Sequence, residues 1–388
     1  MTRRLFLVFV ALVSFGRPLP AKAAGGTPRN SEGNESLQQE VCLALQRGAL
    51  FLKNHQSPNG SWSNASQPAI SGLALLALGQ LPKETGVPAE EALEKGYEFV
   101  RSQAKSDGGI YAYGLSNYNT AICTLALLLR ADPMDAQRIK SAHRFLREQQ
   151  TSNMARSELN GGLGYGPTGV SPKRQHPDLD NTLVSLEALR ACEMARVGEK
   201  NDVPQLDWSA AIAFVTRCQN LPETNPLPWA SAQSGDRGGF VYYPGFSNAG
   251  TTELPGGGKA LRSYGTMTYA GLLSFVYAEV SPQDQRVVAA SEWLRNHFTL
   301  EENPGLGQEG LYYYYHLMAK ALSISGANNN LESGLVPKGW ARALAHKLIL
   351  LQAGDGSWAN SSGRWMETDA TLVTAYSMLA LERARKSF

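Results

Sequence analysis

Two pairs of carboxylates with the same spacing are the residues of this 388-residue sequence best suited to chemistry. Asp178 and Asp180 form the first pair, and Glu367 and Asp369 form the second. Paired acids can serve as general acid and general base on a bound ligand when their surroundings set their pKa values apart. We therefore take Asp178, Asp180 and Asp369 as candidate catalytic residues and Glu367 as a candidate binding residue.

An ordinary helix start is the favoured explanation of the first pair. Asp178 follows Pro177 and suits an N-cap, and Asp180 then lies in the first helical turn, where the helix dipole lowers the pKa of a carboxyl group. A proton donor would need the opposite surroundings, namely burial beside Asp178 and a raised pKa. We expect the cap-like result, with a lowered pKa for Asp180.

The elements that must position these acids are helices of a unit that recurs six times. In the first copy an amphipathic segment, 44–54, ends at the turn Pro58-Asn59-Gly60 and is followed by a segment that is apolar all round, 69–78. The first is expected on the outside and the second inside, because only neighbours on both sides can cover an entirely apolar helix. The other predicted outer and inner segments are 95–103 with 120–129, 143–150 with 181–191, 212–219 with 266–278, 291–298 with 313–322, and 343–352 with 369–381.

The turn of this unit resembles the QW repeat of the squalene and oxidosqualene cyclases, which the protein prenyltransferase β subunits share. The resemblance rests on a glutamine followed by Gly-x-Trp, as in Gln56 and Gly60-Ser61-Trp62, and it covers roughly 37–381. The last copy is nearly as clear as the first, whereas the fifth lacks its glutamine. The resemblance implies an all-α fold over residues 37–388, a single (α/α)6 toroid of six outer/inner helix pairs.

The segment 178–182 is similar to the Asp-x-Asp-Asp-Thr element of acid-initiated terpenoid cyclases, whose middle aspartate protonates an alkene or epoxide. This resemblance gives Asp180 the place of the donor and Asp178 that of the first aspartate, while Asn181 replaces the last one. Segment 367–371 matches 178–182 position for position, three copies later. Because copies three apart face each other across a six-fold ring, we expect the two acid pairs to face each other.

Aromatic residues and long connections indicate where a ligand would bind. Tyr264 and Trp365 fall where inner helices begin, and Tyr312 and His316 belong to the start of the fifth inner helix. Such rings can stabilise a carbocation or stack on a sugar or polyisoprenoid, although most of them are expected to pack between helices. The long connections 151–177, 220–263 and 299–308 each join an outer to an inner helix, so they should share one rim, and we place the site there.

Metal and cofactor chemistry is not indicated. The dipeptide Tyr315-His316 opens an inner helix as the zinc-binding histidine does in protein prenyltransferases, but 262–267 reads R-S-Y-G-T-M where those enzymes have Asp-x-Cys. One histidine without partners makes no tetrahedral zinc site, so we predict no metal and no cofactor. The four cysteines lack Cys-x-x-Cys spacing, and a disulfide between Cys192 and Cys218 is left open.

The amino terminus predicts export. Residues 1–23 combine Arg3 and Arg4, a short apolar run at 5–15, and Ala21-Lys22-Ala23, which has the form of a signal-peptidase site. The run is too short for a stable membrane anchor. The ordinary secretory route is favoured over the twin-arginine route, and residues 24–36 are expected to be a disordered linker.

Charge excludes one class of partner. Removal of the signal peptide would change the net charge from +2 to −2, because it carries four basic residues and no acids. Such a chain has no basic stripe for nucleic acid.

Three functions remain. The first, which we rank marginally ahead, is a toroid that binds an apolar or isoprenoid ligand without catalysis. The second is an acid-initiated terpenoid cyclase or isomerase that uses Asp180, and the third is a secreted carbohydrate hydrolase or lyase.

Overall fold

The computed structural model describes residues 31–169, 171, 174–197, 205–254, 257–327 and 337–388, and this part of the chain is mostly helical. Each of the twelve predicted segments overlaps a helix. The outer helices are α2 (Ser31–Asn54), α4 (Glu90–Ser102), α6 (Ala136–Glu148), α8 (Trp208–Thr216), α10 (Gln285–Asn296) and α12 (Trp340–Leu351). The inner helices are α3 (Pro68–Gly79), α5 (Ser116–Arg130), α7 (Leu179–Met194), α9 (Gly265–Tyr277), α11 (Leu311–Ala327) and α13 (Ala370–Arg385).

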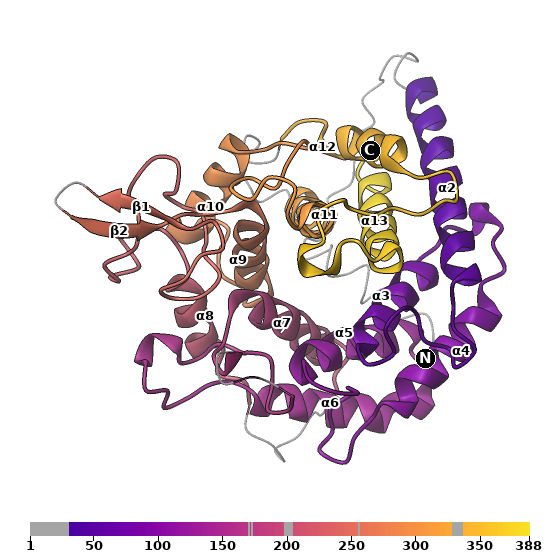
Figure 1. Ribbon diagram of the computed structural model, residues 1–388, viewed down its shortest axis with the longest axis horizontal. Helices are drawn as coiled ribbons and strands as arrows, with labels where there is room; N and C mark the ends of the chain where they lie inside the picture. Colours follow the sequence, from indigo (N-terminus) through magenta and orange to yellow (C-terminus); the bar gives the residue numbers. More distant parts are fainter. Residues whose placement is uncertain (1–30, 170, 172–173, 198–204, 255–256, 328–336) are drawn as a thin grey trace, which may run out of the picture.

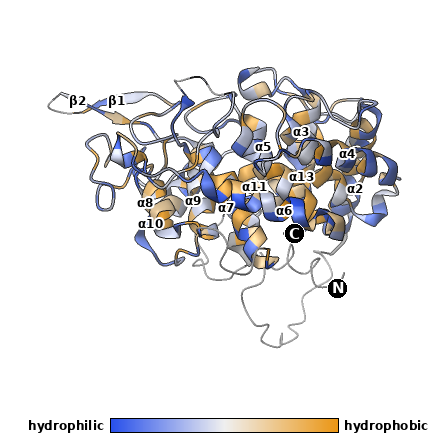
Figure 2. Cartoon of the chain, turned by 90° about the horizontal axis from the view of Figure 1, so that it is seen from below, coloured by the Kyte–Doolittle hydropathy of each residue, from blue (hydrophilic) through white to orange (hydrophobic). Residues whose placement is uncertain are grey.

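The inner helices form a closed ring. Each packs against the next in chain order, from α3 to α13, and α13 packs against α3. Figure 1 looks along this ring and shows the remaining long helices around it. Composition explains the two layers: α3 is buried from Pro68 to Leu78, whereas α4 buries only the stripe that contains Tyr97, Phe99 and Val100. Figure 2 shows the hydrophobic residues concentrated on the helices in the middle of the molecule.

In four of the copies, the repeated glutamine joins its own copy to the next. Gln56 Nε2 donates to the carbonyl oxygen of Gly60 in its own turn (3.0 Å) and to that of Ala92 in α4 (2.8 Å). In the last copy Gln352 Nε2 donates in the same way to its own turn and to the carbonyl oxygen of Ala44 in α2 (2.9 Å). This second bond joins the last copy to the first and so helps to close the ring.

A second repeated contact aligns the copies. A hydroxyl group in the first turns of an inner helix accepts a backbone N–H group from the preceding turn. The donor is the residue two positions after the turn glycine that has a positive φ. The pairs are Trp62 with Ser71, Ile110 with Thr120, Leu163 with Thr182, Phe240 with Thr268, and Trp358 with Thr374. The structural counterpart of Thr182 in the sixth copy is therefore Thr374.

A small β-hairpin that the sequence did not predict lies in the long connection before α9. Strand β1 (Thr251–Leu254) pairs antiparallel with β2 (Gly258–Leu261), with Thr251 opposite Leu261. Figures 1 and 2 show it projecting from one side of the helical body at its upper edge. It adds no layer to the fold.

Helix α2 begins earlier than predicted. Disorder was expected over 24–36, but the helix starts at Ser31. Its first turns are held by the end of α13, where the backbone carbonyl oxygen of Arg385 accepts a hydrogen bond from Gln38 Nε2 (2.9 Å). The sequence pattern could not show this contact, because its partners are far apart in the chain. The predicted signal peptide, 1–23, and residues 24–30 of the predicted linker lie outside the described residues.

The disulfide that the sequence left open is not formed. All four cysteines are free, and Cys192 and Cys218 are both buried. Burial raises the pKa of each of these two thiols, as expected of small core residues. Across the described ranges, no helix has both the length and the apolar character needed to cross a membrane.

Candidate functional site

Asp178 caps α7 and is fully buried. One carboxylate oxygen accepts the backbone N–H of Asn181 (2.9 Å), and the other accepts the Asn181 side-chain amide (2.8 Å). Burial and the charge of Asp180 raise the pKa of Asp178 to about 8, and the bonds from Asn181 and Tyr242 oppose this rise. The cap was predicted, but burial also favours the protonated form of this carboxyl group by raising its pKa.

Asp180 differs from the expected first-turn anion. Its half-buried side chain points toward α11, where the Tyr313 hydroxyl donates to Oδ1 at 2.5 Å. Burial raises the pKa of Asp180 to about 6, although Tyr313 and the charge of Lys320 both act to lower it. The expectation of a lowered pKa was therefore wrong. A helix dipole at the first turn contributes about 1 kcal/mol, whereas burial can move a pKa by several units.

Glu367 positions the tyrosine that contacts Asp180. The carboxylate accepts the Tyr313 backbone N–H (2.7 Å) on one oxygen and the Asn360 side-chain amide (2.7 Å) on the other. It therefore caps the amino end of α11 from a distant part of the chain. Burial raises the pKa of Glu367, and these donors oppose the rise.

Three aromatic side chains lie around the Asp180–Tyr313 pair. Tyr376 of α13 lies 5.2 Å from the ring of Tyr313 and 5.4 Å from that of His316, measured between ring centroids. The hydroxyl groups of Tyr118 and Tyr376 interact, and burial and the charge of Asp180 raise the pKa of Tyr118. Burial and the charge of Lys320 lower the pKa of His316, so this ring is neutral.

A buried ion pair lies deeper between the same helices. Lys320 Nζ of α11 is 2.7 Å from Glu187 Oε2 of α7, and neither side chain is more than 9% exposed. The Tyr277 hydroxyl also interacts with Glu187. Burial lowers the pKa of Lys320, and the charge of Glu187 opposes that change.

The second acid pair does not repeat the first. Asp369 caps α13 by accepting the backbone N–H groups of Thr371 (2.9 Å) and Leu372 (3.3 Å), and it also accepts the Ser63 hydroxyl. Because Thr374 is the counterpart of Thr182, Leu372 and not Asp369 occupies the place of Asp180. The position-for-position match of the two segments was therefore out of register. Within the described part of the chain, no hydrogen bond joins Asp369 to Asp178 or Asp180, so the expected facing of these acids is not seen as a direct contact.

The remaining predicted binding residues are divided between the site and the packing. Tyr264 is the buried N-cap residue of α9. Burial is the main cause of its raised pKa, and the charges of Asp180 and Asp178 raise it further. Trp365 lies before α13, is 45% exposed, and stacks with the Arg364 guanidinium at 4.3 Å. Tyr312 is buried against Tyr315, with ring centroids 5.8 Å apart. The tyrosine that donates a hydrogen bond to Asp180 is thus Tyr313, whereas Tyr312 packs against Tyr315.

Sequence reasoning missed several residues of this cluster. Tyr313 and Lys320 are seven residues apart on α11, as Asp180 and Glu187 are on α7, so each pair lies on one helix face. Lys320 and Glu187 are charged residues at buried positions of inner segments that are mostly apolar. That exception to the apolar composition was the signal by which they could have been found.

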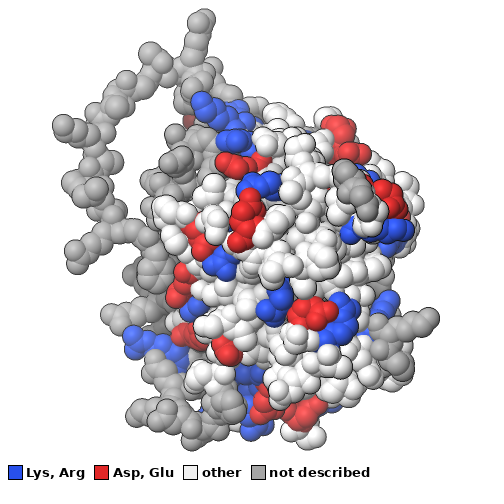
Figure 3. Space-filling model, turned by 90° about the vertical axis from the view of Figure 1, so that its left-hand side faces the viewer, with Lys and Arg blue, Asp and Glu red and all other residues white. Residues whose placement is uncertain are grey.

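The described residues gather no group of three or more His, Cys, Asp or Glu side chains that could hold a metal ion. The absence of zinc stays a prediction. On the face seen in Figure 3, acidic and basic side chains are interspersed, with no large area of one sign.

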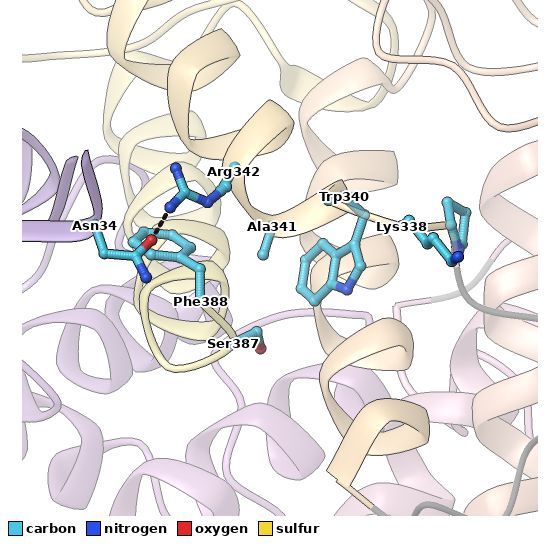
Figure 4. A pocket seen from close by; sticks show the side chains of 9 residues that line it. Asn34, Lys338, Trp340, Ala341, Arg342, Ser387 and Phe388 are labelled. Atoms are coloured by element: carbon cyan, nitrogen blue, oxygen red, sulfur yellow. Dashed lines mark hydrogen bonds between the residues drawn. The ribbon is translucent and has the colours of Figure 1, made fainter. Parts of the chain in front are cut away.

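A separate pocket of about 380 Å³ lies where the amino end of α12 meets both ends of the described chain (Figure 4). Trp340, Arg342 and Phe388 line it, and Arg342 donates a hydrogen bond to Asn34. Its described lining includes no carboxylate side chain, so it provides no acid–base pair.

No protein-family model matches the sequence, and no curated protein matches it. Solved structures with a similar fold include the apo type II terpene cyclase MstE from Scytonema, with 12% identity and a TM-score of 0.53 over 90% of this chain and 99% of that one. Another is Candida albicans protein geranylgeranyltransferase-I complexed with GGPP, with 13% identity and a TM-score of 0.54 over 87% and 90%. A third is a family 76 glycoside hydrolase from a bovine Bacteroides thetaiotaomicron strain, with 11% identity and a TM-score of 0.56 over 88% and 78%.

Identities this low show the fold and nothing finer. The predicted resemblance is confirmed at that level, since the fold is similar over most of the chain to both a terpene cyclase and a protein prenyltransferase. The chain has a helical, toroid-like fold similar to those of this type II terpene cyclase and this protein geranylgeranyltransferase.

Proposed function

We propose that this protein is a single (α/α)6 toroid that binds an apolar isoprenoid ligand at the centre of its inner helices and that Asp180 donates a proton to it. The observation that carries the proposal is a half-buried carboxyl group with a pKa of about 6 surrounded by the rings of Tyr118, Tyr313 and Tyr376. Support also comes from two structures of similar fold, which hold geranylgeranyl dihydroxybenzoate and GGPP.

The chemistry follows from these groups. The O–H bond of protonated Asp180 breaks, and its proton bonds to one carbon of an alkene through the electron pair of the C=C bond. The other carbon becomes cationic, and the tyrosine faces can stabilise that charge. The hydrogen bond from Tyr313 stabilises the Asp180 carboxylate that remains. Loss of a proton from the cation, to that carboxylate or to water, completes a net isomerisation or cyclisation.

Carbohydrate hydrolysis has less support, despite the glycoside hydrolase of similar fold. Such enzymes use two carboxyl groups on either side of the scissile bond. Asp178, Glu367 and Asp369 each accept backbone N–H groups at a helix start. These contacts give all three a role as helix caps. Of the two acid pairs, Asp180 alone is left without such a role, whereas hydrolysis needs two free carboxyl groups.

The test is turnover of isoprenoids by the purified protein. A panel of linear isoprenoid alcohols, acids and diphosphates is incubated with wild type, Asp180→Asn and the control Asp369→Asn, and the products are analysed by mass spectrometry. We expect Asp180→Asn to lower turnover by about 10²–10⁴-fold, the usual contribution of a general acid, and Asp369→Asn to retain it, because asparagine also caps helices.

Two other outcomes would contradict parts of this proposal. If wild type turns over no isoprenoid but one of them raises its melting temperature, the protein binds without catalysis. If none is bound or converted, the isoprenoid proposal is wrong, and polysaccharides become the next substrates to test.

Export belongs to the proposal as well. A signal peptide cleaved after Ala23 would deliver the toroid to the periplasm or the medium, where neither a membrane anchor nor nucleic acid is an expected partner. Sequencing the amino terminus of exported protein should find Ala24 first. Retention of the full-length chain in the cytoplasm would contradict export.

A further inference from the structure

One buried nitrogen beside the tyrosines that surround Asp180 lacks a hydrogen bond. His316 of α11 is 5% exposed, and within the described part of the chain its Nδ1 atom has no hydrogen-bond partner. Most buried polar atoms are paired, because leaving one unpaired is costly, so an exception in a native fold needs an explanation. A ligand that pairs with Nδ1 when it binds would supply one.

His316 lies next to the residues that contact the proton donor. It follows Tyr313 by three residues, so the two side chains are neighbours on one face of α11. Its ring stacks with that of Tyr313, with centroids 6.3 Å apart, and lies 5.4 Å from that of Tyr376 in α13. The Tyr313 hydroxyl donates to Asp180. His316 therefore belongs to the same group of side chains as the acid.

Exposure shows that His316 lies deeper than the acid. Asp180, Tyr118 and Tyr313 are partly exposed although they belong to inner helices, whereas Tyr376 and His316 are buried. Three residues correspond to a rise of about 4.5 Å along a helix. A ligand whose alkene lies at Asp180 would therefore meet His316 with the part that reaches about one turn deeper.

The surroundings of Nδ1 favour a neutral group over an ion. The imidazole is uncharged, because burial lowers the pKa of His316. Lys320, one turn deeper again, is paired with Glu187 at 2.7 Å. A phosphate or carboxylate group at this depth would lose its hydration beside an uncharged ring and a cation that already has a counter-ion. A hydroxyl group can both donate and accept, so it satisfies Nδ1 in either tautomer of the neutral imidazole.

We propose that Nδ1 of His316 recognises a hydroxyl group, so that the ligand of this site is an isoprenoid that bears one, such as an isoprenoid alcohol. This inference rests on the proposed function, because it requires an isoprenoid among the tyrosines. It narrows the substrate class, since proton transfer from Asp180 requires an alkene alone. His316 acts as a specificity residue and takes no part in the proton transfer.

The test compares ligands that differ in the hydroxyl group alone. Geranylgeraniol and farnesol are each titrated beside the hydrocarbon in which hydrogen replaces the hydroxyl group, and intrinsic tryptophan fluorescence reports binding. The measured quantity is the dissociation constant of the hydrocarbon divided by that of the alcohol. Comparing this ratio between variants isolates the hydrogen bond, because changes that affect both ligands equally cancel.

Three variants separate the hydrogen bond from packing. His316→Phe removes both nitrogens and keeps a flat ring beside Tyr313 and Tyr376, and it should fold because an apolar group of similar shape can replace an unpaired polar one at little cost. His316→Asn retains a polar atom near Nδ1, because its amide atoms are also bonded to Cγ. His143→Phe is the control, since His143 of the outer helix α6 is equally buried and its ring nitrogens also lack partners among the described residues.

We expect the ratio to fall by about 10-fold in His316→Phe, because the bound hydroxyl group is then left unpaired. His316→Asn should keep the ratio within about 3-fold of wild type, and His143→Phe should leave it unchanged. An unchanged ratio in His316→Phe, or an equal fall in His316→Asn or His143→Phe, would overturn the inference, whereas isoprenoid binding itself would still support the proposed function.

Two further outcomes are decisive. If His316→Phe lowers the affinity for geranylgeranyl diphosphate more than that for geranylgeraniol, the group that His316 recognises is anionic and the hydroxyl assignment is wrong. If wild type binds neither the alcohols nor the hydrocarbons, the proposed function is rejected, and this inference is rejected with it.

Discussion

Replacing Trp358 with alanine should lower the free energy of unfolding by about 3–5 kcal/mol, the usual cost of removing a large buried side chain. The side chain is fully buried, and its Nε1–H donates to the carbonyl oxygen of Leu348 in α12 (2.8 Å). Gly48 of α2 packs closely on the indole ring of Trp358, since a Cβ atom added to Gly48 would lie 3.0 Å from Cζ3 of that ring. The cavity would therefore open where the last copy meets the first.

Urea denaturation would measure this loss, and Trp365→Ala provides a matched control. Trp365 is 45% exposed, so its removal should change the free energy of unfolding by no more than about 0.5 kcal/mol. If Trp358→Ala cost less than about 1 kcal/mol, the contact between the first and last copies would not carry the stability that we assign to it.

Asp180→Asn should stabilise the protein at alkaline pH by up to about 3 kcal/mol and have little effect below about pH 4. Burial raises the pKa of Asp180 from 3.8 to about 6, so the folded state disfavours its ionised form. Stability associated with this group is therefore fully present below about pH 4 and is lost as the pH rises through about 6. Asparagine cannot ionise, and it can still accept the Tyr313 hydroxyl group.

Urea denaturation of wild type and Asp180→Asn between pH 4 and pH 8 would test this prediction. Asp369→Asn is the control, and its stability should differ little from wild type at every pH, because asparagine caps helices as well as aspartate does. A loss of about 1 kcal/mol in Asp180→Asn at pH 8 would show that Asp180 is a first-turn anion after all.

The difference between the two acid pairs arises from tertiary contacts. Asp178 and Asp369 are both helix caps, a role that local sequence predicts well, because a cap bonds to backbone N–H groups two or three residues away. Asp180 has an unusual pKa because distant residues of α11 and α13 enclose it. Adjacent sequence predicted the favourable helix dipole but could not show the larger cost of desolvation.

The sequence by itself determined the helices and their order. The apolar periodicity identified all twelve segments, and the repeated glutamine and glycine predicted the turn that follows the outer helix of a copy, since both features depend on residues close together in the chain. Only the tertiary structure decided which of four consecutive tyrosines contacts Asp180 and that Lys320 meets Glu187. Those pairings depend on how far α7 and α11 rotate and shift against each other, and a sequence repeat does not specify that packing between distant helices.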